Sequence, residues 1–305
     1  MTLTTAEEVK KKLAEISKHS RPHLDMQRLM TRYAIERFLW RVGQSRHADK
    51  FTLKGAMAFT YYATNSSRTT KDADFMMNGK FSPESIKALL TEIVCIKTDD
   101  GVKFSHAAIT VRIVESEGAN PGYSIHIPAR LGVSACHVYL DISFGEAVSP
   151  DPLKVKIPAL LVDKARYPVL KIYPIETIIA EKYQTIVRLG MSNTRLKDHH
   201  DLYEISRSER VAGASLQKAI RATFERRGTP VTSEVPTGLS KAFCTDKTKL
   251  RDWKATLTQH NVPKSTTLET ACESVIGMIM PVLTALIDNE EFAMVWDKCE
   301  WRSPS

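Results

Sequence analysis

The sequence predicts an α+β protein in which a mixed sheet with helices is followed by a helical C-terminal domain. Strand-like alternation at 138–144, and short β-type runs between glycine turn signals, predict the sheet. Helical periodicity from residue 174 onward predicts the C-terminal helices. With 305 residues, the chain is long for one domain and ample for two. We divide it into an N-terminal helical cap at 1–50, a core at 51–165 and a helical C-terminal domain at 166–305.

The N-terminal cap is predicted to contain two helices. The first, at 5–17, is short and charged, whereas the second, at 25–42, carries apolar residues at helical spacing. Between them the sequence Ser20-Arg21-Pro22 contains a proline, which interrupts a helical pattern.

The core is predicted to begin with a brief strand at 51–53 that ends at Lys54-Gly55. A helix at 56–63, a strand at 72–76 and a helix at 83–93 follow. Several strands come next, and 138–144 is the clearest of them. Its apolar side chains point one way and its polar ones the other, the two sets being Val138, Leu140, Ile142 and Phe144 against Tyr139, Asp141 and Ser143.

The C-terminal domain is predicted to be almost wholly helical, with helices at 174–189, 195–207, 214–227, 236–257 and 268–288. Its longest apolar run, 275–287, is too short to span a membrane and contains Pro281. The N-terminal segment lacks the apolar centre of a signal peptide. We therefore expect no membrane partner.

Five cysteines are dispersed without paired spacing: Cys95, Cys136, Cys244, Cys272 and Cys299. An odd, scattered set is typical of a reducing compartment, so we expect a cytoplasmic protein. No cysteine lies near a histidine at zinc-ligand spacing, which argues against a structural zinc.

The chain is moderately basic, with a net charge of +8 and a pI near 9.1. Such a balance suits an anionic partner such as RNA, DNA or a nucleotide, and equally suits a well-solvated surface. The excess of Lys and Arg falls in 1–50 and 195–254, on either side of a nearly neutral middle.

Asp72-Ala73-Asp74 is the centre of the functional prediction. Residues i and i+2 of a strand project from the same face, so two carboxylates can converge on hard divalent cations, which prefer oxygen ligands. Most Asp-x-Asp pairs are surface turns. Here Phe75-Met76-Met77 continue as an apolar strand, and like charges crowded beside it are unfavourable unless a cation binds.

Asp141 is the natural third ligand, because it projects from the polar face of a strand whose other face is apolar. A half-exposed strand with an aspartate facing water is the alternative.

Lys54-Gly55-Ala56 lies where a predicted strand meets a helix. Glycine lets the backbone approach a phosphate closely, and the first amides of the helix are unpaired donors for an anion. A plain tight turn is the alternative. One helix separates this segment from Asp72, so both elements can meet at the same end of a sheet.

Lys182 falls inside the apolar arc of the 175–189 helix, together with Ile175, Ile179 and Ile186. An unpaired ammonium there is costly to bury. Either its apolar stem extends so that the ammonium reaches water, or it meets an anion such as a triphosphate.

Asp198 and Asp201 share a helix face with Leu202 and Ile205. The alternative is favourable charge near a helix N-terminus together with a Lys197–Asp201 surface pair. We interpret His199-His200 as surface or partly packed residues and not as a metal site. Two basic groups could bind phosphates or simply face solvent: Arg226-Arg227, and Lys247, Lys249, Arg251 and Lys254.

In this order, the motifs resemble those of the AbiEii/AbiGii toxin family of nucleotidyltransferases. The resemblance is nearly end to end, and the ordered set is far more specific than any one motif. It rests on 36–41 (ERFLWR), 51–56 (FTLKGA), 68–74 (RTTKDAD), 140–145 (LDISFG), 173–177 (YPIET), 180–182 (AEK), 195–202 (RLKDHHDL) and 222–227 (ATFERR).

The resemblance implies a polymerase-β-like nucleotidyltransferase core followed by helices that complete the site. Asp72 and Asp74 would be catalytic and bind metal, with Asp141 as the third metal ligand and two Mg²⁺ as the cofactor. Lys54, Gly55, Ala56 and Thr70 would bind the nucleotide, Lys182 would hold the triphosphate, and Asp198 would be an essential acid.

Some members of this family transfer nucleotides to the 3′ end of tRNA and are paired with an antitoxin encoded nearby. The resemblance therefore implies an NTP substrate, an RNA acceptor that we expect to be tRNA, and a toxin that blocks translation or phage growth. Two features differ from the family pattern: Ala56 stands where relatives carry Ser, and His199-His200 where aromatic or aliphatic residues are commoner.

Two rival functions stay open. A metal-dependent nuclease would use the same three carboxylates, but it would have no use for Lys54-Gly55 or for Lys182 on an apolar face. A catalytically silent nucleotide- or RNA-binding module would need no turnover at all.

Overall fold

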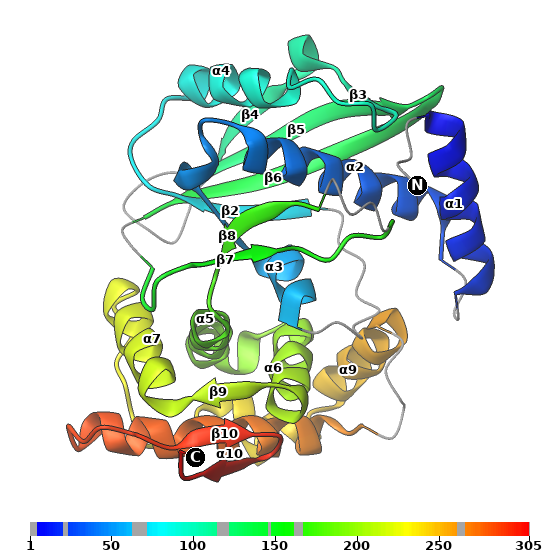
Figure 1. The fold of residues 1–305 in the computed structure, drawn as a ribbon. Helices are drawn as coiled ribbons and strands as arrows, with labels where there is room; N and C mark the ends of the chain where they lie inside the picture. Colours follow the sequence, from blue (N-terminus) through cyan, green and yellow to red (C-terminus); the bar gives the residue numbers. More distant parts are fainter. Residues whose placement is uncertain are drawn as a thin grey trace. The chain divides into compact units, whose positions relative to one another are not determined.

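A computed structural model of the protein (Figure 1) describes residues 5–20, 24–62, 72–114, 122–145, 148–161, 167–260 and 266–304. The chain divides into two compact units. Unit 1 comprises 1–64, 68–147 and 152–173, and unit 2 contains 148–151 and 174–305. Each unit has its own buried apolar core.

Unit 1 carries the helices α1 (Ala6–His19), α2 (Met26–Gln44), α3 (Gly55–Tyr62) and α4 (Pro83–Val94). A capping box between Thr5 and Glu8 starts α1, and the Asp25 side chain accepts a hydrogen bond from the Arg28 amide at the start of α2. The predicted helices of the cap are therefore confirmed. Short 3₁₀ turns occupy Ala48–Lys50 and His106–Ala108.

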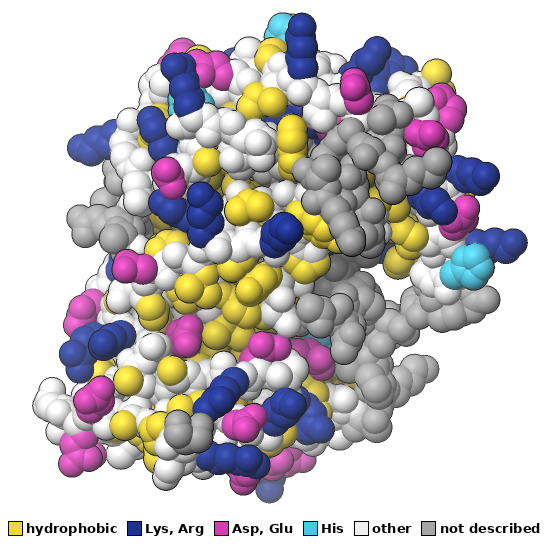
Figure 2. Space-filling view, in the orientation of Figure 1, with side chains coloured by type: hydrophobic (Ala, Val, Ile, Leu, Met, Phe, Trp, Pro, Cys, Tyr) yellow, Lys and Arg dark blue, Asp and Glu magenta, His cyan; other side chains and the backbone are white. Residues whose placement is uncertain are grey.

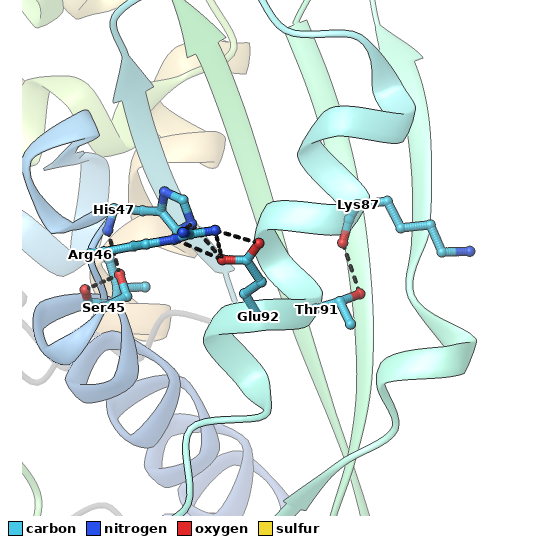
Figure 3. A network of polar contacts seen from close by, with 7 residues as sticks. Ser45, Arg46, His47, Lys87, Thr91 and Glu92 are labelled. Atoms are coloured by element: carbon cyan, nitrogen blue, oxygen red, sulfur yellow. Dashed lines mark hydrogen bonds and ion pairs between the residues drawn. The ribbon is translucent and has the colours of Figure 1, made fainter.

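A close set of polar contacts joins the end of α2 to α4 (Figure 3). Arg46 donates three hydrogen bonds to the Glu92 carboxylate: Nε to Oε2 at 3.1 Å, and Nη2 to Oε1 at 2.9 Å and to Oε2 at 2.8 Å. His47 Nε2 lies 2.9 Å from Glu92 Oε2. Hydrogen bonds from His47 and then Arg46 lower the pKa of Glu92. The group is exposed to water, so we expect it to add little to stability.

The eight described strands of unit 1 form one mixed sheet in the order β3-β5-β6-β2-β1-β8-β7, with β4 also paired to β5. The pairs β2–β6 and β1–β8 are parallel and the others antiparallel. This arrangement confirms the predicted mixed sheet. The strands are β1 (Phe51–Lys54), β2 (Asp72–Met77), β3 (Val102–Phe104), β4 (Thr110–Val114), β5 (Gly122–Leu131), β6 (Ser134–Phe144), β7 (Leu153–Lys156) and β8 (Val169–Ile172).

One face of this sheet is buried under α2, which Figure 1 shows lying across it. Phe75 of β2 meets Phe38 of α2 edge-on, with ring centroids 6.5 Å apart, and meets Phe51 of β1 at 5.2 Å. Along β6 burial alternates as predicted: Leu140 is buried and Asp141 is exposed. Because the apolar face is covered, the polar side chains of β2 and β6 project from the opposite face.

Unit 2 is built from α5 (Ile175–Leu189), α6 (Leu196–Ser208), α7 (Gly213–Arg226), α8 (Lys241–Thr245), α9 (Lys247–His260) and α10 (Leu268–Ile287), with 3₁₀ turns at Gly190–Ser192 and Thr237–Leu239. The prediction of one helix at 236–257 is wrong. Ser240 caps α8, and Asp246 then accepts hydrogen bonds from the amides of Thr248 and Lys249, which starts α9 separately.

Unit 2 also contains a sheet of three short strands that the sequence did not predict. Its strands are β9 (Arg210–Ala212), β10 (Val295–Asp297) and β11 (Glu300–Arg302), in the order β11-β10-β9. Three residues are too few to reveal a period of two, and β9 pairs with a segment more than eighty residues further along the chain.

The helix α10 is the one described helix long and apolar enough to cross a membrane by length and composition. The helix passes this test because it begins at Leu268, before the apolar run at 275–287, and continues through Pro281. Half of its most apolar window is buried inside the protein. Val275, Met278 and Ile279 are among its fully buried side chains, as in a core helix.

Candidate active site

Three carboxylates lie on the face of the unit 1 sheet opposite α2. Asp72 and Asp74 are two residues apart on β2, and Asp74 is in register with Asp141 on the parallel strand β6. Adjacent strands run about 4.8 Å apart, so these residues are direct neighbours across the two strands. Both strands lie inside the sheet and not at either edge.

The turn that joins β1 to α3 lies against Asp74. Gly55 has a φ of +64°, and a Cβ added there would collide with Oδ2 of Asp74 and lie 2.7 Å from its Cγ. Lys54 is in register with Asp74 on the antiparallel strand β1. Glycine is needed at this position for its conformation and for the space. The prediction that this segment and the aspartates meet is therefore confirmed.

Ala56 and Thr70 are the other two residues that were predicted to bind the nucleotide. Ala56 is buried in the first turn of α3, with 8% of its surface exposed. Thr70 lies outside the described residues.

The carboxylates fit a hard divalent cation in residue type and in placement on one face. Asp72 and Asp74 are half-buried and Asp141 is exposed. Within the described ranges, no three His, Cys, Asp or Glu side chains come together as a group that could hold a metal ion. Metal binding by Asp72, Asp74 and Asp141 thus stays a prediction.

In unit 2, Lys182 is held by two aspartates of α6. Its Nζ lies 2.7 Å from Asp198 Oδ1 and 2.7 Å from Asp201 Oδ2. The Lys182 side chain is 15% exposed, and those of Asp198 and Asp201 are 1% and 0% exposed. The lysine therefore meets an anion supplied by the chain itself. Asp201 is thus a buried partner of Lys182 and not a surface acid.

The charges of this cluster balance. Burial by itself would raise the pKa of Asp198, but the Lys182 ammonium and the Arg195 guanidinium outweigh that effect and lower its pKa below the ordinary value. Arg195 Nε lies 3.0 Å from Asp198 Oδ2. The sequence prediction missed Arg195, although its spacing of three residues from Asp198 is typical of a helical ion pair.

The two neighbouring histidines of α6 are both buried, so they are packed more completely than the predicted surface or partly packed residues. His199 Nε2 lies 2.9 Å from the Gly238 carbonyl oxygen, and its ring stacks on Phe243 at 5.1 Å. Burial lowers the pKa of His199 and favours its neutral form. Adjacent side chains can both be buried because α6 packs against α5, α9 and α10.

Three of the basic residues that were candidates for phosphate binding contact other groups of the protein. Arg226 Nη2 lies 2.9 Å from Glu181 Oε1, and Arg227 donates to the Gln184 side chain. Lys249 is buried and donates to the Asn193 carbonyl oxygen at 2.8 Å. Lys249 is thus a structural residue of unit 2.

The sequence model of the nucleotidyl transferase AbiEii toxins of type IV toxin–antitoxin systems matches residues 37–274. That span includes the three aspartates of unit 1 and the Lys182 cluster of unit 2. The chain belongs to the AbiEii family. It is therefore a nucleotidyltransferase toxin, and its type IV class implies a nucleotide substrate and a cognate antitoxin.

Two solved structures from Helicobacter pylori are similar to this AbiEii protein. JHP933 is 15% identical with a TM-score of 0.48, and the match covers 87% of this chain and 96% of JHP933. A provisionally assigned nucleotidyltransferase is 14% identical with a TM-score of 0.45, covering 88% of this chain and 99% of the other. No functionally curated protein matches the chain significantly.

Proposed function

We propose that this AbiEii toxin transfers a nucleoside monophosphate from an NTP to the 3′ end of tRNA, with two Mg²⁺ ions as the cofactor. The observation that carries the proposal is the position of Asp74. The Asp74 carboxylate lies against Gly55 on one side, and Asp74 is in register with Asp141 of β6 on the other. The turn proposed to bind phosphate and the carboxylates proposed to bind metal thus adjoin in one unit.

The residues of unit 1 would have separate roles. Asp72, Asp74 and Asp141 would hold the ions, which when bound neutralise charge on the triphosphate and activate the attacking oxygen. The amides at the start of α3, which have no acceptor within the helix, would bind a phosphate, and Lys54 would add positive charge beside it.

In the proposed reaction the 3′ hydroxyl oxygen of the RNA attacks the α-phosphorus of the NTP. A new phosphodiester bond forms, the bond between the α-phosphorus and the bridging oxygen breaks, pyrophosphate leaves, and the hydroxyl proton passes to water. The protein's contribution is mainly positioning and electrostatics.

Lys182 and Asp198 would act from unit 2, Lys182 by holding the triphosphate and Asp198 by orienting the lysine ammonium. Because Lys182 is engaged by Asp198 and Asp201, binding a triphosphate would require it to exchange at least one of these partners. The same contacts would keep the ammonium in place until a nucleotide arrives.

The proposed acceptor explains how transfer would be toxic. A tRNA whose original terminal 3′ hydroxyl is joined to an added nucleotide cannot accept an amino acid at that position, so translation in the cytoplasm would stop, and with it phage growth in an infected cell. A basic protein with a pI near 9.1 suits a polyanionic acceptor. Figure 2 shows Lys and Arg side chains scattered over the visible surface of each unit, which favours contacts spread along an RNA.

The test is to incubate the protein with each labelled NTP and total tRNA, with Mg²⁺ or with excess EDTA. We expect label on tRNA with at least one NTP, only when Mg²⁺ is present, and expect Asp74→Asn to abolish it. Periodate-oxidised tRNA, which lacks a free 3′ hydroxyl, is the matched control and should stay unlabelled.

Three outcomes would contradict the proposal. Absence of Mg²⁺-dependent label with all four nucleotides would refute transfer to tRNA. RNA that shortens without added NTP would indicate a nuclease. RNA binding that survives replacement of Asp72 and Asp74 by Asn, with no turnover in the parent protein, would indicate a binding module.

A further inference from the structure

Three aromatic rings lie together on the carboxylate face of the unit 1 sheet: His126 on β5, and His137 and Tyr139 on β6. The His126 ring centroid is 4.8 Å from that of Tyr139 and 5.1 Å from that of His137. The interplanar angles within the three pairs are 18°, 26° and 27°. We refer to these three residues as the ring cluster.

The ring cluster is fixed in position but open to solvent. His126 Nε2 lies 2.9 Å from His137 Nδ1, so one imidazole donates a hydrogen bond to the other and holds the two rings together. Tyr139 is 46% exposed, although it lies near the middle of a strand whose other face is fully buried. His137 is also exposed, so two neighbouring rings are open to a ligand on this face.

The ring cluster adjoins the candidate active site directly. Tyr139 is in register with Asp72 on β2 and with His126 on β5. In the strand order β5-β6-β2-β1, the carboxylates of β2 and β6 lie between the rings on one side and the Lys54-Gly55 turn of β1 on the other. A phosphate bound at Gly55 leaves the side with the rings for a second substrate.

The surroundings of the ring cluster are positively charged. Lys103 on β3, Arg112 on β4 and Arg130 on β5 are exposed, and the pairing register places them on this same face. In the described parts of β3 to β6, Asp141 is the one acidic residue on the face. Aromatic rings flanked by basic side chains are what single-stranded nucleic acid requires, since bases stack on the rings while cations follow the phosphates.

We propose that the ring cluster, with Tyr139 as its exposed member, stacks an unpaired base at the 3′ end of the RNA acceptor. The inference rests on the proposed function and identifies where the acceptor would bind. Stacking at Tyr139 would hold the terminal nucleotide beside Asp72, where its hydroxyl is needed. Lys103, Arg112 and Arg130 would contact the phosphates that precede it.

The first experiment measures binding without requiring catalysis. Full-length protein is titrated into a fluorescein-labelled short single-stranded RNA, and the dissociation constant is read from anisotropy. Loss of one stacked base weakens binding by roughly tenfold, so Tyr139→Ala should raise the dissociation constant by about that factor. Tyr139→Phe keeps the ring and should bind within about twofold of wild type.

Two controls accompany this titration. Leu153→Ala removes a side chain of matching exposure, 45%, from β7 on the opposite flank of the sheet, and should leave binding unchanged. The same RNA annealed to its complement has no unpaired base, so its weaker binding should be equal for wild type and Tyr139→Ala.

The second experiment uses the transfer reaction. Tyr139→Ala should raise the KM for the RNA acceptor about tenfold while leaving the KM for the NTP and the rate at saturating RNA close to wild type. An increase confined to the KM for the NTP would overturn the proposal, because the ring cluster would then bind the nucleotide base.

The two proposals fail in different ways. If wild type labels tRNA and Tyr139→Ala does so with an unchanged KM and unchanged RNA binding, the ring cluster has no part in acceptor binding. The other case is that no NTP labels tRNA, while Tyr139→Ala binds single-stranded RNA more weakly than Tyr139→Phe does. The stacking site is then supported and the proposed reaction is refuted.

Discussion

Lys182 Nζ lies 2.7 Å from Asp198 Oδ1, so a lysine on the apolar arc of α5 is held there by a carboxylate from α6. Asp201 contributes a second carboxylate at the same distance. Removing the ammonium would leave two carboxylates buried with only part of their compensation, since Arg195 contacts Asp198. Loss of Lys182 alone should therefore destabilise unit 2, whatever its part in catalysis.

Lys182→Met keeps the apolar stem but removes the charge. We expect it to lower the free energy of unfolding by roughly 3 kcal/mol, because breaking a buried ion pair leaves an uncompensated charge. Urea denaturation followed by circular dichroism measures the change. The control is Lys197→Met, on the exposed side of α6, where a substitution should change stability by about 0.5 kcal/mol or less. Equal midpoints for the two variants would show that the cluster contributes nothing to stability.

Gly55→Ala should abolish nucleotide transfer, because its Cβ would displace the Asp74 carboxylate. The backbone cost of a positive φ must be separated from this collision. Gly228 provides the matched control, since it has a φ of +57° and nothing within 4 Å of an added Cβ. Gly228→Ala should lose about 1 kcal/mol of stability and keep its activity. Equal activity in the two variants would show that Asp74 need not hold its position.

Much of the fold could be predicted because its elements carry strong local signals. The alternation along β6 placed Asp141 opposite Leu140, and the apolar spacing in α5 placed Lys182 among isoleucines. The pairing of β9 with β10 could not be predicted, because it joins short segments far apart in the sequence. Local periodicity carries no information on such partners.

The candidate site was predictable in part for the same reason. The i, i+2 spacing placed Asp72 and Asp74 on one face, whereas their register against Asp141 depends on which strand pairs with β2. The burial of His199 and His200 was missed because a helix wheel assumes one covered side, and α6 is covered on several. The ring cluster also required knowledge of strand pairing, since His126 and Tyr139 are in register only across β5 and β6.

His199 should make stability depend on pH. Burial lowers the pKa of His199 in the folded protein. In the unfolded chain the His199 pKa is about 6.5, so the unfolded chain binds a proton more readily than the folded protein does. The His199 contribution is therefore complete above pH 6.5 and declines as the pH falls below it, by at most about 1.4 kcal/mol per pH unit. Urea midpoints measured from about pH 7.5 to about pH 5 should fall more steeply for wild type than for His199→Gln.

His106→Gln, which removes an exposed imidazole, is the control for that series. Its unfolding midpoints should follow those of wild type at every pH. If His199→Gln also follows wild type across the series, another group is responsible for the slope.

Asp141→Asn tests whether the third carboxylate binds metal. Loss of a residue that only supports a metal ligand costs about 10–100-fold, so loss of a ligand should reduce transfer by at least about 100-fold and raise the Mg²⁺ concentration needed for half-maximal activity. Asp141 is exposed, and its replacement should leave the melting temperature unchanged. Asp49→Asn is the matched control, since its 85% exposed side chain pairs only with a surface lysine, Lys171, among the contacts described. An unchanged Mg²⁺ requirement in Asp141→Asn would restrict the ligand set to Asp72 and Asp74, and would leave Asp141 as an acid beside the acceptor.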